Sequence, residues 1–132
     1  MRVADVMQPD VKTIDPDAAL ADVLVSLADA HISALAVVDR AGRMLGVVSN
    51  SDVIAVEAEA EERGRAELLR GTAVRDIMTP RTLTISPEAD IREAARQMLY
   101  AEVHRLFVAS DGELLGVIST TDIVRALATG KV

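Results

Sequence analysis

The chain has 132 residues, 50% of them hydrophobic, so it can form a sizeable core, and it has no cysteine, which excludes disulfides, thiolate catalysis and cysteine metal sites. Its formal net charge is −7, because 14 lysines and arginines stand against 21 aspartates and glutamates. This balance argues against a nucleic-acid binder, which usually carries a basic face.

The first segment of the chain occurs twice. Residues 3–9 (VADVMQP) return as residues 74–80 (VRDIMTP), and residues 45–52 (LGVVSNSD) return as residues 115–122 (LGVISTTD). Because the matching segments follow one another in the same order, the chain contains two copies of one unit.

Each copy is predicted to contain a strand, a helix, two strands and a second helix. After a short strand at residues 13–14, Asp15 can cap a helix and Pro16 suits its first position. Copy two repeats this start at residues 86–88. The spacing i, i+3, i+4, i+7 predicts the core faces of these helices at Leu20, Val23, Leu24 and Leu27, and at Ile91, Ala94, Ala95 and Met98.

Two apolar strands joined by a polar turn follow each of these helices. The predicted pairs are residues 35–38 with 44–48, and residues 106–109 with 114–118. Near-continuous apolar strands imply sheets whose faces are covered. A unit of about 55 residues is marginal alone, so we expect the two units to pack into one body.

The segment between the copies is rich in helix formers. We expect it to extend the last helix of the first copy and to bend or end near Gly64, with its charges on a solvated face. The predicted organisation is a first domain over residues 1–56, a helical linker over 57–73 and a second domain over 74–129.

The segments Ser49–Asp52 and Ser119–Asp122 each follow an apolar strand and begin a helix. The pattern S-x-x-D predicts a capping box, in which the Ser caps the helix and the Asp reaches back to backbone amides. The Asp could instead accept hydrogen bonds from two ribose hydroxyls, since a carboxylate has two oxygens. The helix N-terminus and its hydroxyls would then face a phosphate. Both interpretations can hold together.

In this order, and occurring twice, the motifs resemble a tandem pair of CBS domains, also called a Bateman module. Further markers are residues 33–39 (SALAVVD) and 104–108 (HRLFV). The resemblance covers residues 3–128 and leaves no segment for a catalytic or DNA-binding domain, so the chain looks like a stand-alone module. The family often has Pro in its second strand, where this chain has Ala36 and Phe107, and Phe107 could alter the shape of the expected cleft.

The resemblance implies an α+β fold in which two β-α-β-β-α units pack with pseudo-twofold symmetry into one compact module. It also implies a regulatory, ligand-sensing role. Adenosine-containing ligands such as AMP, ADP, ATP or S-adenosylmethionine would bind in two clefts between the copies, and no cofactor would be required. The bound state would be signalled to an unidentified partner protein, and two modules would pair into a homodimer.

By the same resemblance, each cleft takes its base-binding wall from one copy and its Asp from the other; an adenine needs an apolar slot there. One cleft would be formed by Gln8, Pro9, Val11, Ile32, Ser33, Ala34, Ser119, Thr121 and Asp122. The other would be formed by Thr79, Pro80, Thr82, Val103, His104, Ser49, Ser51 and Asp52. Ile32 and Val103 could equally be core residues.

His104 and Arg105 precede the second strand of copy two. Taken alone, they would be an ordinary histidine and a surface charge. At a position that faces the central cleft in the family, they resemble a phosphate clamp, since the planar guanidinium fork suits phosphate oxygens. Copy one has the uncharged Ser33 and Ala34 there, so the two clefts are expected to differ chemically.

Patterns for catalysis and metal binding are missing from the sequence. No Ser-His-Asp set can be proposed, since His31 has no counterpart in copy two. There is no G-x-x-x-x-G-K-[ST] pattern, and two histidines with scattered acids do not have metal-site spacing. We therefore expect a protein that is not an enzyme and holds no metal.

Other functions and the location follow from the same residues. One alternative is a non-enzymatic protein-interaction or dimerisation module with vestigial clefts. Binding of nucleic acid through Lys12, Arg81, Arg105 and Arg125 is disfavoured by the net charge and the scarcity of aromatic residues.

No apolar run approaches the roughly 20 residues of a membrane span. Asp5 lies where a signal peptide is apolar, so we expect a cytoplasmic protein without a membrane partner.

Overall fold

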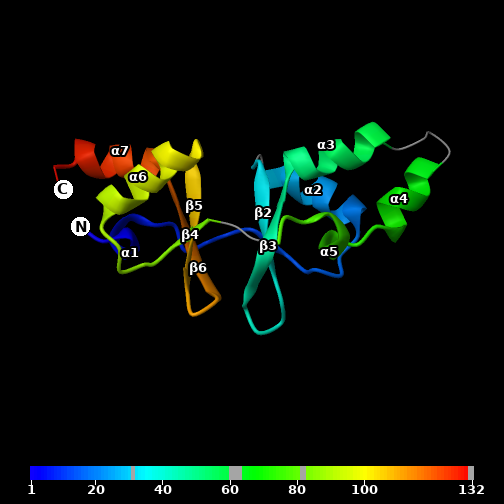
Figure 1. Cartoon of the computed structure of the whole chain (residues 1–132), viewed down its shortest axis with the longest axis horizontal. Helices are drawn as coiled ribbons and strands as arrows, with labels where there is room; N and C mark the ends of the chain where they lie inside the picture. Colours follow the sequence, from blue (N-terminus) through cyan, green and yellow to red (C-terminus); the bar gives the residue numbers. More distant parts are fainter. Residues whose placement is uncertain (31, 60–63, 81–82, 131–132) are drawn as a thin grey trace. The chain divides into compact units, whose positions relative to one another are not determined.

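The computed structural model describes residues 1–30, 32–59, 64–80 and 83–130 (Figure 1). The elements of the first copy are α1 (Val3–Val6), β1 (Thr13–Ile14), α2 (Leu20–Ala30), β2 (Ala34–Val38), β3 (Met44–Ser49) and α3 (Asn50–Glu59). Between the copies lies α4 (Arg65–Gly71). The elements of the second copy are α5 (Val74–Ile77), β4 (Thr84–Ile85), α6 (Ile91–Ala101), β5 (Arg105–Ser110), β6 (Glu113–Ser119) and α7 (Thr120–Ala128).

Each copy contributes one three-stranded sheet, and the two sheets have identical topology. Their orders are β1-β2-β3 and β4-β5-β6. The first strand of each runs parallel to the second, which is antiparallel to the third. Even the register repeats, because Thr13 pairs with Ala36 as Thr84 pairs with Phe107. The structure therefore confirms the predicted α+β fold class and its internal duplication.

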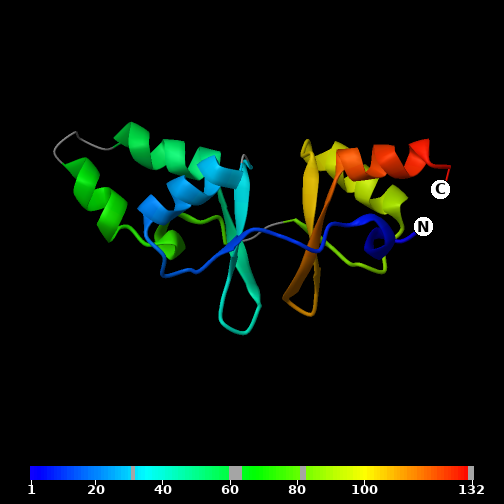
Figure 2. The ribbon, with the colours of Figure 1, turned by 180° about the vertical axis from the view of Figure 1, so that it is seen from behind.

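The compact units of the structure are not continuous in sequence. The C-terminal unit consists of Met1–Val11 and Leu83–Val132, and the N-terminal unit is Lys12–Thr82. The opening segments, which we define as residues 3–9 and 74–80, thus each pack with the other copy's sheet and helices. Figure 2 shows α1, in blue, beside α6 and α7, in yellow and red.

Backbone hydrogen bonds hold the opening segments in place. In the C-terminal unit, Gln8 and Val117 exchange two hydrogen bonds, of 2.8 and 2.9 Å. In the N-terminal unit, Thr79 and Val47 do the same, at 2.8 and 3.0 Å. Each opening segment thereby pairs for a short distance with the third strand of the sheet in the same compact unit.

The glycine of each G-V-V/I-S motif is needed for this pairing. A Cβ atom on Gly116 would lie 2.7 Å from the carbonyl oxygen of Gln8, and one on Gly46 would lie 2.4 Å from that of Thr79. Both distances are far below van der Waals contact, and the opposing atoms belong to the backbone. The motif therefore carries glycine because two backbones approach each other there.

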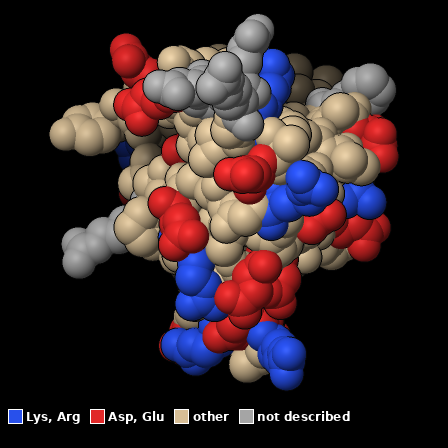
Figure 3. All heavy atoms as spheres, turned by 90° about the vertical axis from the view of Figure 1, so that its right-hand side faces the viewer, with Lys and Arg blue, Asp and Glu red and all other residues tan. Residues whose placement is uncertain are grey.

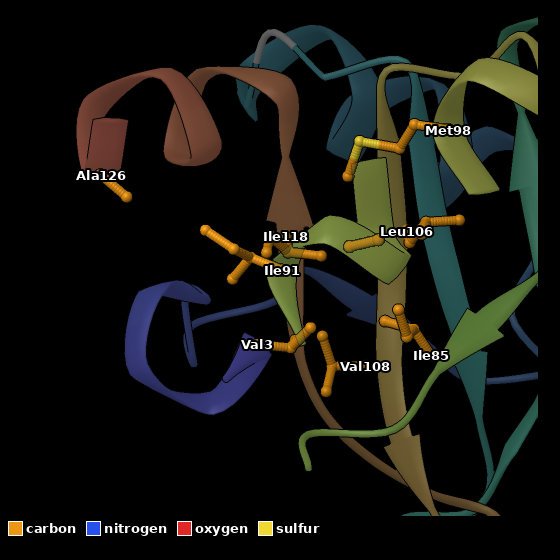
Figure 4. Packing of buried hydrophobic residues seen from close by; sticks show 9 residues of the cluster. Val3, Ile85, Ile91, Met98, Leu106, Val108, Ile118 and Ala126 are labelled. Carbon is orange, nitrogen blue, oxygen red and sulfur yellow. The ribbon is translucent and has the colours of Figure 1, made fainter. Parts of the chain in front are cut away.

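The opening segments also supply core residues. Val3 is fully buried among Ile91, Leu106, Val108 and Ile118 in the C-terminal unit (Figure 4). Its counterpart Val74 is fully buried in the core of the N-terminal unit. Burying a valine side chain stabilises a fold by roughly 1.5–3 kcal/mol, so each opening segment is anchored by its first residue.

The predicted start of the first helix is wrong by about one turn. α2 begins at Leu20 rather than Pro16. The carbonyl oxygens of Pro16 and Ala18 accept N–H groups of Arg75 and Val74 from the opening segment, both at 2.9 Å. Those carbonyls are therefore engaged across the unit instead of bonding N–H groups four residues further along a helix.

The same correction applies to the second copy. α6 begins at Ile91 rather than Pro87. The carbonyl oxygens of Pro87 and Ala89 accept the N–H groups of Ala4 and Val3, at 2.9 and 2.8 Å. The turn whose sequence resembles a helix start therefore binds the opening segment through its backbone carbonyls.

Most of the predicted core positions on these helices are confirmed. The buried residues are Leu20, Val23, Leu27, Ile91, Ala94 and Met98. The prediction is wrong for Leu24, which is 37% exposed, because it lies beside a hollow between α2 and α3 that nothing fills among the described residues. Ala95, its counterpart, is half-buried beside an equivalent hollow.

The described part of the segment between the copies contains the helix α4. α4 is capped by Gly64 and packs against α2, and its Leu69 contacts the core of the N-terminal unit. The expected continuity with α3 falls on residues 60–63, which lie outside the described residues.

Among the residues that the structure describes, no helix is both long and apolar enough to cross a bilayer. Figure 3 shows Lys and Arg side chains interspersed with Asp and Glu over the face that it displays.

Candidate functional site

The segment that begins α7 forms a complete capping box. Ser119 is the N-cap residue, and its Oγ accepts the N–H of Asp122 at 3.2 Å. Asp122 Oδ2 accepts the N–H of Ser119 at 2.8 Å and its Oγ–H at 3.0 Å. One oxygen of the carboxylate is therefore committed to the start of the helix.

The segment that begins α3 has the same geometry. Asp52 Oδ2 accepts the N–H of Ser49 at 2.8 Å and its Oγ–H at 3.0 Å, and Ser49 Oγ accepts the N–H of Asp52 at 3.3 Å. The capping interpretation of both sequence motifs is thus confirmed.

The second oxygen of each carboxylate contacts an opening segment. Asp122 Oδ1 accepts Gln8 Nε2 at 3.1 Å and Arg125 Nη1 at 3.4 Å. Asp52 Oδ1 accepts Thr79 Oγ1 at 3.3 Å. The structure therefore brings Gln8 to Asp122 and Thr79 to Asp52, as the predicted clefts require. Each pair joins residues from different copies within one compact unit.

The two carboxylates differ in burial. The side chain of Asp122 is 6% exposed, whereas Asp52 is half-buried. A buried carboxylate is stable only with several donors, and Asp122 has four. The two sites are therefore unequal in their immediate surroundings.

Other predicted site residues that lie near these pairs in the sequence are exposed or half-buried. Pro9 and Pro80 are exposed, and Val11 is half-buried. Ser51 and Thr121 lie in the first turns of α3 and α7, with exposed side chains. Three residues named in the sequence analysis lie outside the described residues: His31, Arg81 and Thr82.

The residues before the second strand of each sheet lie at the start of the helix that follows the third strand. The N–H of Asn50 donates to the carbonyl of Ser33, and the N–H of Thr120 donates to that of His104, both at 2.9 Å. Both side chains, Ser33 and His104, are exposed. A backbone bond therefore ties each of these positions to a helix N-terminus.

Arg105 and Ala34 are equivalent first residues of their strands. Arg105 pairs with Ser119 across β5 and β6, and Ala34 pairs with Ser49 across β2 and β3. Arg105 is exposed. The C-terminal unit thus has an exposed arginine paired across the sheet with a capping serine, where the N-terminal unit has an alanine.

Each predicted cleft draws on both compact units. Ile32, Ser33 and Ala34 belong to the unit of Asp52, and Val103 and His104 belong to that of Asp122. Ile32 and Val103 are half-buried, and each packs against the core of its own unit, so the core interpretation holds for both. The clefts themselves remain a prediction.

Arg125 contacts the candidate site residue Asp122, a role that the sequence analysis did not assign to it. It appeared there only among the cations considered for nucleic acid. In the structure it donates to Asp122, three residues earlier on α7. The i, i+3 spacing of opposite charges on a helix was the available signal.

Metal ligation finds no support among the described residues, where no three His, Asp or Glu side chains gather closely enough to hold an ion.

Comparison with known proteins identifies the class. The family model of the CBS domain matches residues 3–59 and 74–129. The chain belongs to the CBS domain family and carries a tandem pair of these domains.

Individual curated relatives match most of this chain. The chain is 27% identical to the chloroplastic CBS domain-containing protein CBSX2 of Arabidopsis thaliana over 94% of its own length and 62% of that protein. It is 29% identical to the inosine-5′-monophosphate dehydrogenase of Bifidobacterium longum, over 90% of its own length and 21% of the enzyme. The chain thus spans less than two thirds of these relatives.

Solved structures agree with the fold. The crystal structure of CBSX2 in complex with AMP superposes with a TM-score of 0.83 at 30% identity, and 99% of this chain and 98% of that one are covered. The CBS domain pair of MJ0100 in complex with 5′-methylthioadenosine and S-adenosylmethionine has a TM-score of 0.77 at 20% identity, covering 100% and 98%.

Proposed function

We propose that the protein is a regulatory module that binds adenosine-containing ligands, namely AMP, ADP, ATP or S-adenosylmethionine, between its two CBS domains and signals their presence to a partner protein. The observation that carries this proposal is the pair of carboxylates at the starts of α3 and α7. Each has one oxygen committed to the helix cap and one that contacts only side chains.

The side-chain-bonded oxygen is the one suited to a ribose. Two adjacent hydroxyls can donate to Oδ1 of Asp52 or Asp122 once the side-chain donors there give way, and the cap on Oδ2 stays intact. Binding can therefore occur without loss of the helix start.

Phosphate recognition would use groups at the same helix ends. The exposed hydroxyls of Ser51 and Thr121 lie in the first helical turn, where the helix dipole favours an anion. The exposed guanidinium of Arg105, together with His104, supplies a cation in the second copy only. By resemblance, these groups face the ligand cleft. The similarity to CBSX2, which was crystallised with AMP, supports the adenosine ligand.

The regulatory role is non-enzymatic in this proposal. Ligand binding alters the protein only if the ligand's affinity differs between two conformations or association states. We place this event in the cytoplasm, although the Arabidopsis relatives are described as chloroplastic.

Titration calorimetry with AMP, ADP, ATP and S-adenosylmethionine tests the proposal. We expect at least one to bind, and absence of heat for all four at about millimolar concentration would contradict it. Asp122→Asn keeps an oxygen for the Ser119 cap but loses the charge that receives the ribose hydroxyls. Because charge-assisted hydrogen bonds contribute about 1.5–3 kcal/mol, this variant is expected to weaken one binding event about tenfold or more.

Arg105→Ala provides the matched test of the phosphate clamp. It is expected to weaken AMP more than adenosine, since only AMP carries the phosphate that the guanidinium binds. Equal losses for the two ligands would contradict the assigned role of Arg105.

An interaction module with vestigial clefts is the second candidate, favoured by exposed apolar side chains on the helix pairs. Leu99 of α6 and Val124 of α7 are exposed beside a hollow of about 540 Å³, and Leu127 of α7 is exposed as well. An equivalent hollow of about 390 Å³ lies between α2 and α3. This candidate predicts stable dimers whose melting temperature no nucleotide changes.

A further inference from the structure

Asp52 and Asp122, the two carboxylates proposed to bind ribose, differ in one charged contact. Asp122 Oδ1 receives Gln8 Nε2 and the guanidinium of Arg125, whereas Asp52 Oδ1 receives the hydroxyl of Thr79. The residue equivalent to Arg125 in the first copy is Ala55. The guanidinium is therefore specific to the second copy.

The acceptor positions of Asp122 are fully used. Both Ser119 donors occupy Oδ2, and Gln8 and Arg125 occupy Oδ1. A ligand hydroxyl can bind only by displacing one donor. Arg125 is the donor most easily displaced, because its contact is the longest, at 3.4 Å, and its side chain is 63% exposed.

If a ligand hydroxyl displaces Arg125 from Asp122, the guanidinium is left in a defined pocket. Gln8, Asp122 and Arg125 line a pocket of about 310 Å³ in the C-terminal unit. Among the described side chains of its lining, Arg125 is the only cation, and Asp5 and Asp122 are the only anions. Asp5 already accepts the backbone N–H of Arg2, at 2.9 Å. A guanidinium that leaves Asp122 therefore gains most from an anionic group brought in by the ligand itself.

Resting on the function proposed above, we propose that Arg125 makes the Asp122 site selective for adenosine ligands that carry a phosphate over neutral adenosine. A neutral nucleoside must break the ion pair and gives the guanidinium nothing in return. AMP breaks the same pair and supplies a phosphate, for which the guanidinium fork has the right geometry. The residue acts as a specificity determinant for the ligand's charge.

Calorimetry on a single-site background measures this selectivity. Asp52→Asn removes the charge at the other site but keeps an oxygen for the Ser49 cap. The readout is the Kd of adenosine divided by the Kd of AMP, before and after Arg125→Ala. We expect the ratio to fall about tenfold, since AMP loses a charged partner and adenosine no longer competes with one.

Arg92→Ala is the matched control, because Arg92 is an exposed arginine on α6 whose removal is expected to leave the ratio unchanged. An unchanged ratio in Arg125→Ala, with AMP still bound, would overturn the inference. Failure of AMP and adenosine to bind even the unsubstituted chain would instead contradict the proposed function.

The reciprocal variant asks whether the guanidinium alone is sufficient. On an Asp122→Asn background, Ala55→Arg places an arginine three residues after Asp52 on α3. The ratio at that site is expected to rise. A ratio that changes neither here nor in Arg125→Ala would rule out the proposed determinant.

Discussion

Single residues in this fold serve structure and the candidate site together. Asp122 completes the cap of α7 with one oxygen and contacts the opening segment with the other. Its loss would therefore lower both stability and binding, and only Asn, which keeps the cap, separates the two effects. Gly116 is a purely structural counterpart, because the backbone of Gln8 lies where a side chain would start.

Gly116→Ala is expected to destabilise the protein by about 1–3 kcal/mol, because a methyl group would force the opening segment away from β6. Urea unfolding followed by circular dichroism measures the change. Gly71→Ala is the matched control: it lies in α4 with open space around it, and should be neutral or slightly stabilising. Equal stability of the two variants would show that the opening segment is not held against Gly116.

At the scale of elements, the start of α6 depends on charged residues. Asp90 is its N-cap residue and accepts the N–H of Arg92 at 2.9 Å. This hydrogen bond lowers the pKa of Asp90 below its usual 3.8. The side-chain hydrogen bond from Arg96 likewise lowers the pKa of Glu93 below 4.5. Both carboxyl groups are therefore ionised more readily in the folded protein than in the unfolded chain.

The pH dependence follows from the direction of these shifts. A lowered folded-state pKa stabilises the fold above the unfolded pKa, and this contribution disappears as the pH falls through the folded pKa. Asp90→Ala is therefore expected to lower the melting temperature at neutral pH, with a difference from wild type that shrinks as the pH drops below 3.8. Thermal unfolding over this pH range checks it, with Asp10→Ala, an exposed aspartate between α1 and β1, as control. A difference independent of pH would contradict the assigned role.

At the scale of the whole molecule, both helix pairs carry exposed apolar side chains beside a hollow. Contiguous exposed apolar patches are uncommon on monomeric proteins, and they often mark interaction sites. The same face occurs in both copies, at α2 with α3 and at α6 with α7. A second copy of the chain could cover both with like against like, which suits the symmetric pairing of homodimers.

Val124→Arg, on α7, is expected to convert a homodimer into monomers, because it places a charge where an apolar contact is proposed. Light scattering after gel filtration measures the mass, and far-ultraviolet circular dichroism verifies folding. Ala58→Arg, exposed on α3 away from the hollow, serves as the control and should stay dimeric. A folded Val124→Arg variant with the mass of a dimer would exclude this face.

Much of the fold follows from local sequence. The strand pairs are set by apolar runs around polar turns, and the capping boxes by Ser and Asp three residues apart, because these depend on neighbours in the chain. Because the unit occurs twice, each strand pair and each capping box could be predicted in both copies. The sequence also pointed to Gln8 with Asp122 and to Thr79 with Asp52, through the family resemblance.

The tertiary structure decided what no local pattern encodes. It placed each opening segment in the other copy's core, anchored by Val3 or Val74, and it moved the helix starts to Leu20 and Ile91, because carbonyls that a helix would use bond the opening segment instead. It also brought the guanidinium of Arg125 into contact with the carboxylate of Asp122. These outcomes depend on hydrogen bonds and packing between residues distant in the chain, and only the folded chain brings those residues together.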